Sequence, residues 1–224
     1  GLNKSASELN NYQPVGAVSG CSFAIRSDML KNINGFDSDF FLYQEDADLS
    51  WRIRFAGGKI MYVPESIIYH KFKLSISPQK EFYLERNRYL ILLKNFSLNT
   101  LILLLPAFIV TEIVTMSHAI LNGPKYVKSK ILAYFWIIQN FKEILTKRRE
   151  TLSKKRISDK EFFEFLDWKI PFDQVIENSI LSRTVAALFN SFYELNMNLI
   201  RKIDVSIKDT KNQSNNLDFE ASNT

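Results

Sequence analysis

Acidic and aromatic side chains gather in one short stretch of the sequence, residues 35–52. A loop rich in Phe leads directly into three carboxylates, Glu45, Asp46 and Asp48. Sugars pack their apolar faces on aromatic rings, and carboxylates can hold their hydroxyl groups. A carboxylate at the edge of a pocket can also remove a proton from an attacking hydroxyl, which is worth about 10²–10⁴-fold in rate. The stretch is therefore the first candidate for a binding or catalytic site.

The same residues also allow a purely structural interpretation. Glu45 and Asp46 can cap the N-terminus of a helix, and Asp48 can pair with Arg52 one turn further on. Asp46 precedes Leu49 by three residues, so it shares a helix face with the apolar stripe that begins there. Without further context, the structural roles are the more common ones for such carboxylates.

Short elements surround this stretch and would position it. An apolar run at residues 22–25 predicts a strand, and Ser27 is expected to cap a short helix over residues 28–33. A second helix is predicted over residues 45–56, because Gly57 and Gly58 follow its apolar stripe. The pattern further predicts a strand over residues 59–63 that resumes at 67–69, and a long helix over residues 79–96.

Composition limits the class of protein. The 224 residues suit one to two domains. A hydrophobic content of 46% with few glycines favours helices and a buried core. The single cysteine, Cys21, excludes an internal disulfide framework and a Cys-based zinc site. The net charge of +5 admits nucleic acid or anionic lipid as a partner.

The segment from Leu98 to Leu121 is almost continuously apolar. A membrane-spanning helix needs about 20 such residues, but Pro106, Glu112 and His118 interrupt this one. An acidic residue at the bilayer centre costs about 2.5–3.5 kcal/mol on insertion scales. We therefore expect either a marginal span or a hairpin that lies in the membrane interface.

Apolar residues recur at helical spacing over residues 131–145, which predicts an amphipathic helix at a membrane surface. Two basic clusters follow, at residues 147–149 and 154–156. This placement fits anionic lipid better than nucleic acid, because a nucleic-acid binder would interleave basic and aromatic residues on one face. Ser158 and Glu161 form a capping-box pattern that opens another helix.

These patterns divide the chain into four regions. The first 90 residues contain the candidate site, and residues 91–150 are expected to form hydrophobic and amphipathic membrane-associated helices. Residues 151–205 are expected to be a helical C-terminal region. The tail, residues 206–224, is rich in Asn and Ser and is expected to be disordered.

A set of motifs occurs in a fixed order: Gly20, Arg26, Asn34-Gly35-Phe36-Asp37, Phe40-Phe41-Leu42-Tyr43, Glu45-Asp46-Ala47-Asp48-Leu49, Arg52, Gly57-Gly58, Pro64 and His70. In order and spacing this set resembles family 2 glycosyltransferases of the GT-A fold, especially rhamnosyltransferase-like members. The run from Glu85 to Tyr89 and the leucine-rich region behind it look like members with a membrane-associated C-terminal extension. The resemblance implies an α/β fold class, in which the acceptor-side half of a GT-A (Rossmann-like) domain precedes an α-helical C-terminal region.

The resemblance implies a role for each matching carboxylate. Asp46 corresponds to the base that deprotonates the acceptor hydroxyl. That hydroxyl then attacks the anomeric carbon, and the nucleoside diphosphate leaves with inversion. Glu45 and Asp48 correspond to neighbours that shape the acceptor site. The remaining residues expected to contact substrate in this region are Phe36, Asp37 and Tyr43.

Three basic or metal-binding side chains are also implied. His70 matches a position that in some GT-A enzymes helps to hold the divalent metal or the diphosphate. Arg86 and Arg88 are expected to neutralise a diphosphate or the phosphate of a lipid-linked acceptor. The structural alternatives stay open, because a lone His at a strand end is often merely exposed and arginines on a helix often pair with nearby glutamates.

One part of the family pattern is missing from this sequence. GT-A enzymes bind the nucleotide on an N-terminal half, where an Asp-x-Asp motif holds Mg²⁺ or Mn²⁺. The triplet Asp37-Ser38-Asp39 has these residue types but lies in the acceptor loop, so we do not assign it as the metal motif. We expect the main metal ligands to lie outside this chain. The chain, which starts at Gly1, is expected to be the C-terminal part of a longer enzyme and inactive alone.

The sequence thus favours a glycosyltransferase that moves a sugar from a nucleotide-sugar donor to a polysaccharide or lipid-linked acceptor. We expect it to act at the cytoplasmic face of the cell membrane, against anionic lipid and without a nucleic-acid partner. The alternative is a non-catalytic membrane-binding or assembly module, in which residues 98–156 carry the function and the acidic cluster is architectural.

Overall fold

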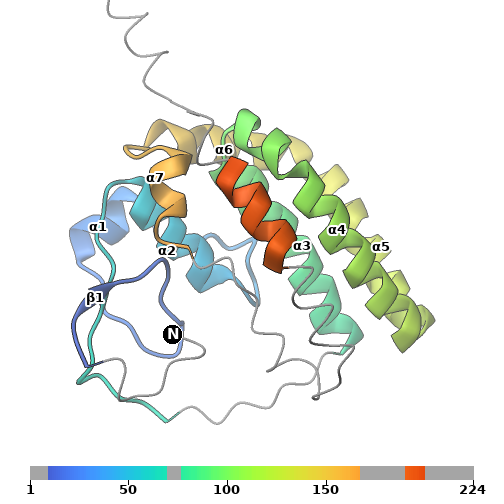
Figure 1. The fold of residues 1–224 in the computed structure, drawn as a ribbon, viewed down its shortest axis with the longest axis horizontal. Helices are drawn as coiled ribbons and strands as arrows, with labels where there is room; N and C mark the ends of the chain where they lie inside the picture. Colours follow the sequence, from blue (N-terminus) through green and yellow to red (C-terminus); the bar gives the residue numbers. More distant parts are fainter. Residues whose placement is uncertain (1–9, 70–76, 167–189, 200–224) are drawn as a thin grey trace, which may run out of the picture.

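The computed structural model describes residues 10–69, 77–166 and 190–199, and helix dominates them (Figure 1). Of these residues 65% are helical and 2% lie in strands. The described residues are therefore mostly helical, whereas the expected sheet of the α/β half is reduced there to one short pair. Most of the expected helical region at residues 151–205 lies outside the described residues. The labelled elements are β1 Gln13–Pro14, α1 Ser27–Asn32, α2 Glu45–Phe55, β2 Met61–Tyr62, α3 Pro78–Asn95, α4 Leu98–Asn122, α5 Pro124–Gln139, α6 Phe141–Ser153 and α7 Asp159–Phe163.

The strands β1 and β2 pair antiparallel over two residues each. Arg54 of α2 supports this pair, because its Nη2 donates to the carbonyl of Ile60 at 2.7 Å and also to that of Val15. The predicted strands at residues 22–25 and 67–69 are not strands in the structure. A strand needs a neighbour for its backbone groups, and no other described segment pairs with them.

Helix α2 is the central element of the N-terminal half. It begins after Tyr43 and Gln44, which both have left-handed backbone angles, and it ends before Gly57, where φ is +82°. The glycine permits the helix to stop there, because other residues rarely adopt that angle. The predicted helix at residues 45–56 is confirmed. One side of α2 packs on an apolar cluster formed by Ile33, Leu49, Ile53, Ala56 and Ile60.

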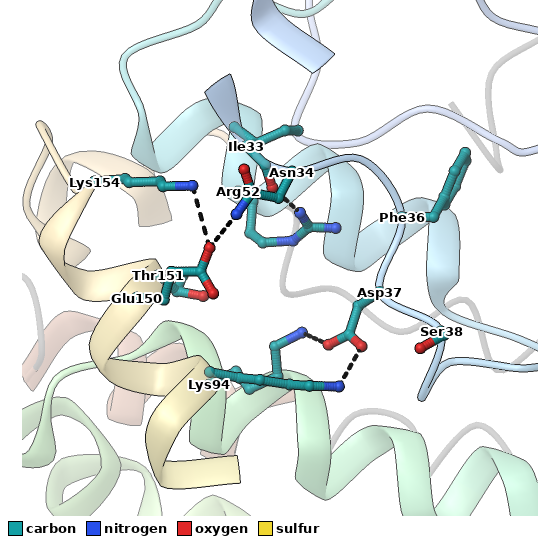
Figure 2. Close-up of a pocket in the computed structure, with 11 residues that line it drawn as sticks. Ile33, Asn34, Phe36, Asp37, Ser38, Arg52, Lys94, Glu150, Thr151 and Lys154 are labelled. Carbon is teal, nitrogen blue, oxygen red and sulfur yellow. Dashed lines mark hydrogen bonds and ion pairs between the residues drawn. The ribbon is translucent and has the colours of Figure 1, made fainter. Parts of the chain in front are cut away.

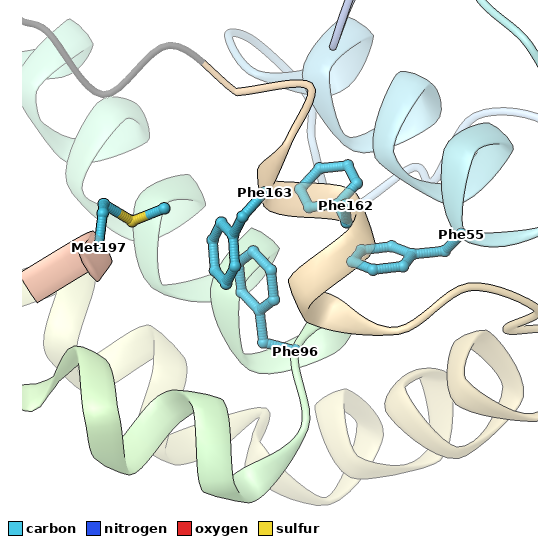
Figure 3. Close-up of a cluster of buried hydrophobic side chains, with 5 residues drawn as sticks. All are labelled: Phe55, Phe96, Phe162, Phe163 and Met197. Carbon is cyan, nitrogen blue, oxygen red and sulfur yellow. The ribbon is translucent and has the colours of Figure 1, made fainter. Parts of the chain in front are cut away.

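The opposite side of α2 meets an aromatic core that joins both halves of the chain (Figure 3). Phe55 of α2 stacks on Phe162 of α7 with ring centroids 4.3 Å apart, and Phe96 stacks on Phe163 at 5.1 Å. Met197, from residues 190–199, belongs to the same buried cluster. The capping box predicted at Ser158 is confirmed, and it begins the short helix that delivers two of these rings.

Helices α3, α4, α5 and α6 form a second group, beside the elements that surround α2 (Figure 1). Helix α3 packs against α5 and α6, and α4 packs against α5. The apolar segment 98–121 is one continuous helix, α4, in which Pro106 is accommodated. The alternative of a hairpin within this segment is therefore wrong. By length and composition, α4 is the single helix among the described residues that could cross a membrane.

Many apolar residues on α4 and α5 point outward, whereas charged side chains lie where these two helices meet α3. Lys130 of α5 is fully buried, and its Nζ lies 2.8 Å from Glu85 of α3 and 3.0 Å from Glu112 of α4. The large exposed side chains on α4 and α5 are Leu98, Ile102, Leu105, Ile109, Ile113, Val114, Ile120, Leu121, Ile131, Leu132, Phe135 and Ile138. The arrangement is the reverse of a helix pair that packs an apolar seam inward.

Three of the basic side chains in the clusters at residues 147–149 and 154–156 bind acceptors within the protein and do not face outward, as a membrane-facing surface would require. Lys147 binds Asp37 at 2.7 Å, and Arg148 donates to the carbonyl of Leu93. Lys155 is buried and pairs with Asp159. These three cations therefore hold the protein together internally, because each meets a buried or half-buried acceptor. Arg149 and Arg156 are the members of the clusters that stay exposed.

Candidate active site

Asp46 lies in the first turn of α2 and is partly exposed. Its Oδ2 accepts a hydrogen bond of 2.7 Å from the backbone N–H of Gly20, and its Oδ1 accepts one from the N–H of Ala47. A Cβ at Gly20 would lie 3.5 Å from Oδ2. The loop that carries Gly20 is also held by Ser50, whose Oγ accepts from the N–H of Val18 at 3.1 Å. Two backbone N–H groups thus orient the carboxylate of Asp46, and part of the side chain stays accessible to solvent.

The loop that precedes α2 is held from α3. Asn87 donates from Nδ2 to the carbonyl of Leu42 at 2.8 Å and to that of Tyr43 at 2.6 Å. Tyr43 itself is half-buried. Two oxygens at the same corner, Oε1 of Gln44 and Oε2 of Glu45, are buried without a donor among the described residues. The start of α2, where Glu45 and Asp46 lie, is thus held by hydrogen bonds and still has acceptor oxygens without a donor among the described residues.

Asp48 occupies a different environment, although it is only two residues from Asp46. It is fully buried. One oxygen lies 2.8 Å from Nε of Arg52, and the other accepts from Lys94 at 3.2 Å and Asn95 at 3.1 Å. The pairing with Arg52 that the structural interpretation predicted is confirmed. Contact between Asp48 and an acceptor stays a prediction that this geometry does not favour, because its oxygens are already bound.

Asp37 lies in the aromatic loop and joins that loop to α3 and α6. Lys94 binds its carboxylate (Figure 2). Lys147 binds the same carboxylate and also that of Asp39. Burial opposes ionisation of Asp37, but the two lysines outweigh it and lower its pKa to about 2. Next to it, the ring of Phe36 is 52% exposed and meets Phe23 edge-on at 6.3 Å. The two carboxylates of the Asp37-Ser38-Asp39 triplet are therefore engaged by lysines.

Arg86 and Arg88 face inward, which does not favour the expectation that they meet a diphosphate. Arg86 is buried, its guanidinium lies 4.6 Å from the ring centroid of Trp136, and it donates to the carbonyl of Asp39. Burial lowers the pKa of Arg86. Arg88 pairs with Glu85 and lies 2.8 Å from Glu112. Both side chains thus already have partners, which come from the neighbouring helices and from the loop between α1 and α2.

No metal site is assigned within the described residues. There, no three His, Cys, Asp or Glu side chains gather closely enough to hold an ion. His70, the predicted metal or diphosphate contact, lies outside the described residues. The expectation that a divalent metal is held mainly from outside this chain stays a prediction.

Several residues that shape the candidate site were missed by sequence reasoning, above all Lys94 and Lys147. Each joins Asp37 across a long sequence separation, which local patterns cannot reveal. A partial signal exists for Lys94, since it follows the buried Leu90 by four residues and so lies on the buried face of α3. A lysine at such a position predicts an acidic partner but does not identify it.

Comparison with known proteins agrees with the motifs around Asp46. Residues 5–88 match a family model described as glycosyltransferase like family 2. Two N-acetylglucosaminyl-diphospho-decaprenol L-rhamnosyltransferases, from two strains of Mycobacterium tuberculosis, are 38% identical over 60 residues. That stretch covers 26% of this chain and 20% of each relative, so the chain spans only a small part of their length. No solved structure matches the chain significantly. Residues 5–88 are therefore a glycosyltransferase family 2 domain, with distant partial similarity to a rhamnosyltransferase.

Proposed function

We propose that this chain forms the acceptor side of a glycosyltransferase, and that Asp46 is its general base. The enzyme would move a sugar from a nucleotide-sugar donor to a polysaccharide or lipid-linked acceptor. The family match over residues 5–88 supports the reaction class. The names of the two similar proteins, which are rhamnosyltransferases with a lipid-linked acceptor, support this choice of substrate class.

The observation that carries the proposal is the setting of Asp46. Oδ2 is aimed by the N–H of Gly20 at 2.7 Å, and the side chain keeps an exposed edge. Asp48, in contrast, has no exposed edge and binds two cations. A general base must come within about 2.6–3.2 Å of the proton that it removes. Among these two carboxylates, Asp46 is the one that an acceptor hydroxyl can approach.

The proposed chemistry is a single displacement. A carboxylate oxygen of Asp46 takes the proton of the acceptor hydroxyl, while the oxygen of that hydroxyl forms a bond to the anomeric carbon. The bond from the anomeric carbon to the diphosphate breaks, its electrons leave with the diphosphate, and the configuration inverts. The proposal assigns the divalent metal to ligands beyond the described residues, where it would neutralise the leaving diphosphate.

The test is the substitution Asp46→Asn in the natural full-length protein. Asparagine keeps the shape and can still accept from Gly20, but it cannot take a proton. We expect transfer from sugar nucleotides to fall by about 10²–10⁴-fold, with an unchanged unfolding midpoint in urea. Asp28→Asn is the matched control, since Asp28 is an exposed aspartate in the first turn of α1. Unchanged turnover in Asp46→Asn would remove the assignment.

A second part of the proposal concerns the membrane. We infer that the outer face of α4 and α5 contacts lipid at the cytoplasmic face of the cell membrane. Ile102, Ile109 and Ile113 lie on this face and are each more than half exposed. Lys125 and Lys128, near the N-terminus of α5, are exposed as well and suit an anionic lipid surface. A lipid contact would bring a lipid-linked acceptor to the enzyme. It would equally suit a non-catalytic membrane-binding module, which the Asp46 test separates.

A further inference from the structure

A cavity of about 230 Å³ lies between the Ile33–Ser38 loop and α6 (Figure 2). Its walls include Asn34, Phe36 and Asp37 from the loop, Arg52 from α2, Thr151 from α6 and Lys154 directly after that helix. A water molecule in the liquid occupies about 30 Å³, and sites for drug-sized ligands hold about 300–1,000 Å³. The cavity therefore has the size for one small ring. Asp46 is not among its lining residues.

The charges around this cavity neutralise one another. Each of its four cations is paired with a carboxylate: Lys94 and Lys147 with Asp37, Lys147 also with Asp39, Arg52 with Asp48, and Lys154 with Glu150. The cations and these carboxylates are equal in number. A ligand with two negative charges, such as a phosphate dianion, therefore gains little net attraction. A neutral polar ligand fits this balance better.

Hydrogen-bonding groups at the cavity are nevertheless left unused. Three other helical threonines, Thr111, Thr115 and Thr146, donate to the carbonyl four residues earlier. Such a bond is the usual arrangement for a threonine inside a helix. Thr151 makes no such bond within the described part of the chain and directs its side chain to the cavity wall. A hydroxyl can both donate and accept, so it suits a ligand that carries hydroxyl groups.

Arg52 adds a second unused donor. Its Nε binds Asp48, and its Nη1 donates to the carbonyls of Ile33 and Gly35 at 2.7 Å each. Its Nη2 is buried and has no acceptor among the described residues. A buried donor without a partner is costly, so a ligand oxygen at this wall would be stabilising. Phe36, with an exposed ring, supplies an apolar surface at the same cavity.

We propose that the cavity binds one neutral sugar ring of the acceptor glycan, as a second sugar site separate from Asp46. The inference rests on the proposed function, which makes a glycan the substrate. Arg52 follows Asp46 by six residues, which is about 9 Å along the axis of α2. Asp46 is also absent from the residues that line the cavity, so a ring held there is not in contact with it. The site would instead hold a sugar unit that does not react.

The test measures binding of methyl glycosides to the full chain by saturation-transfer NMR. Methyl α-L-rhamnoside, methyl β-N-acetylglucosaminide and methyl α-glucoside serve as probes. We expect saturation transfer to at least one of them with the unaltered chain. Thr151→Val removes the hydroxyl but keeps the shape and should weaken binding about fivefold, as the loss of one neutral hydrogen bond predicts. Phe36→Ala should weaken binding as well.

The matched control is Thr146→Val, on the same helix. The Thr146 hydroxyl is exposed and donates to the carbonyl of Lys142, four residues earlier. It should bind the probes as the unaltered chain does. Asp46→Asn should also bind them normally, even where it abolishes turnover, so failure of catalysis and failure of this site are distinguishable. Absence of saturation transfer with every probe would overturn the proposal. Equal losses in Thr146→Val and Thr151→Val, loss of binding in Asp46→Asn, or displacement of the probes by inorganic phosphate would overturn it too.

Discussion

Asp46 and Asp48 stand two positions apart on α2, and their surroundings differ because a helix turns about 100° per residue. Asp46 therefore faces the Gly20 loop, while Asp48 faces α3 and meets Lys94 and Asn95. The two carboxylates look alike in the sequence. The position of α3 is what separates the partly exposed carboxylate of Asp46 from the buried, ion-paired carboxylate of Asp48.

Asp48→Ala is expected to destabilise the protein strongly. It would leave Arg52 and Lys94 buried without one of their acceptors, and removing one partner of a buried ion pair typically costs about 3–5 kcal/mol. Urea unfolding followed by circular dichroism measures the loss. Asp28→Ala, at an exposed ion pair, is the control and should stay within about 0.5 kcal/mol of the unaltered chain. A loss below about 1 kcal/mol in Asp48→Ala would contradict a structural role for this carboxylate.

Asp37 gives the stability a predictable dependence on pH. Its pKa falls from 3.8 to about 2 in the folded protein, because Lys94 and Lys147 outweigh the effect of burial. Since the folded value is the lower one, the ionised carboxylate stabilises the fold fully above about pH 5, and this contribution is lost as the pH falls toward 2. The difference in unfolding free energy between the unaltered chain and Asp37→Asn should be constant near neutral pH and shrink below about pH 4. A difference that does not change with pH would exclude this explanation.

At the scale of elements, the helices were the predictable part. The spacing of apolar residues and the glycines at 57 and 58 located α2, and the apolar pattern located α3. The capping box at Ser158 was found because its two hydrogen bonds are local. The strands were less predictable: the one expected at residues 59–63 is confirmed in part by β2, whereas residues 22–25 have a strand-like composition but no partner among the described residues. Strand formation depends on a neighbour that the local sequence does not specify.

Helix α7 is short, and its contribution lies in the rings that it places. Phe162 is fully buried and meets Phe55, Phe96 and Trp51. Phe162→Ala should lower the unfolding free energy by about 3–5 kcal/mol, because it removes buried area and leaves a cavity. Phe41→Ala, at a ring that is 73% exposed, is the control and should cost far less. Equal losses in the two variants would contradict the assignment of Phe162 to the core.

At the scale of the whole molecule, the direction of the basic side chains was not predictable. Lys147 and Lys155 sit in clusters that look like membrane-facing patches, yet Lys147 reaches Asp37 across 110 positions of sequence. The charge of a cluster is a local property, whereas its direction depends on which distant carboxylate lies opposite. The same reason applies to Arg86 and Arg88, whose expected contact with a phosphate stays a prediction and whose partners in the structure come from distant segments.

The outward apolar face of α4 and α5 predicts binding to vesicles. The full chain is expected to float with vesicles that contain phosphatidylserine, and less well at high salt, because part of the attraction is electrostatic. The double substitution Ile109→Ser and Ile113→Ser should weaken binding about tenfold or more, since each isoleucine loses apolar contact with lipid.

Ile67→Ser with Ile68→Ser is the control for that experiment. These two isoleucines are also exposed, but they lie outside α4 and α5. The control variant should float as the unaltered chain does. Failure of the unaltered chain to float would refute the membrane part of the proposed function, and equal losses in both double variants would refute the choice of face.

The family match ends at residue 88, but the ion pairs around Asp37 and Asp48 do not. Two of their cations, Lys94 and Lys147, follow the matched stretch in the chain, and only Arg52 lies within it. A shortened protein that stops at the family boundary would keep both aspartates and lose the lysines that neutralise them. It would also expose the buried face of α3 to water. The stretch that matches the family is therefore shorter than the stretch that these ion pairs join, and a truncated variant should extend at least to Lys147.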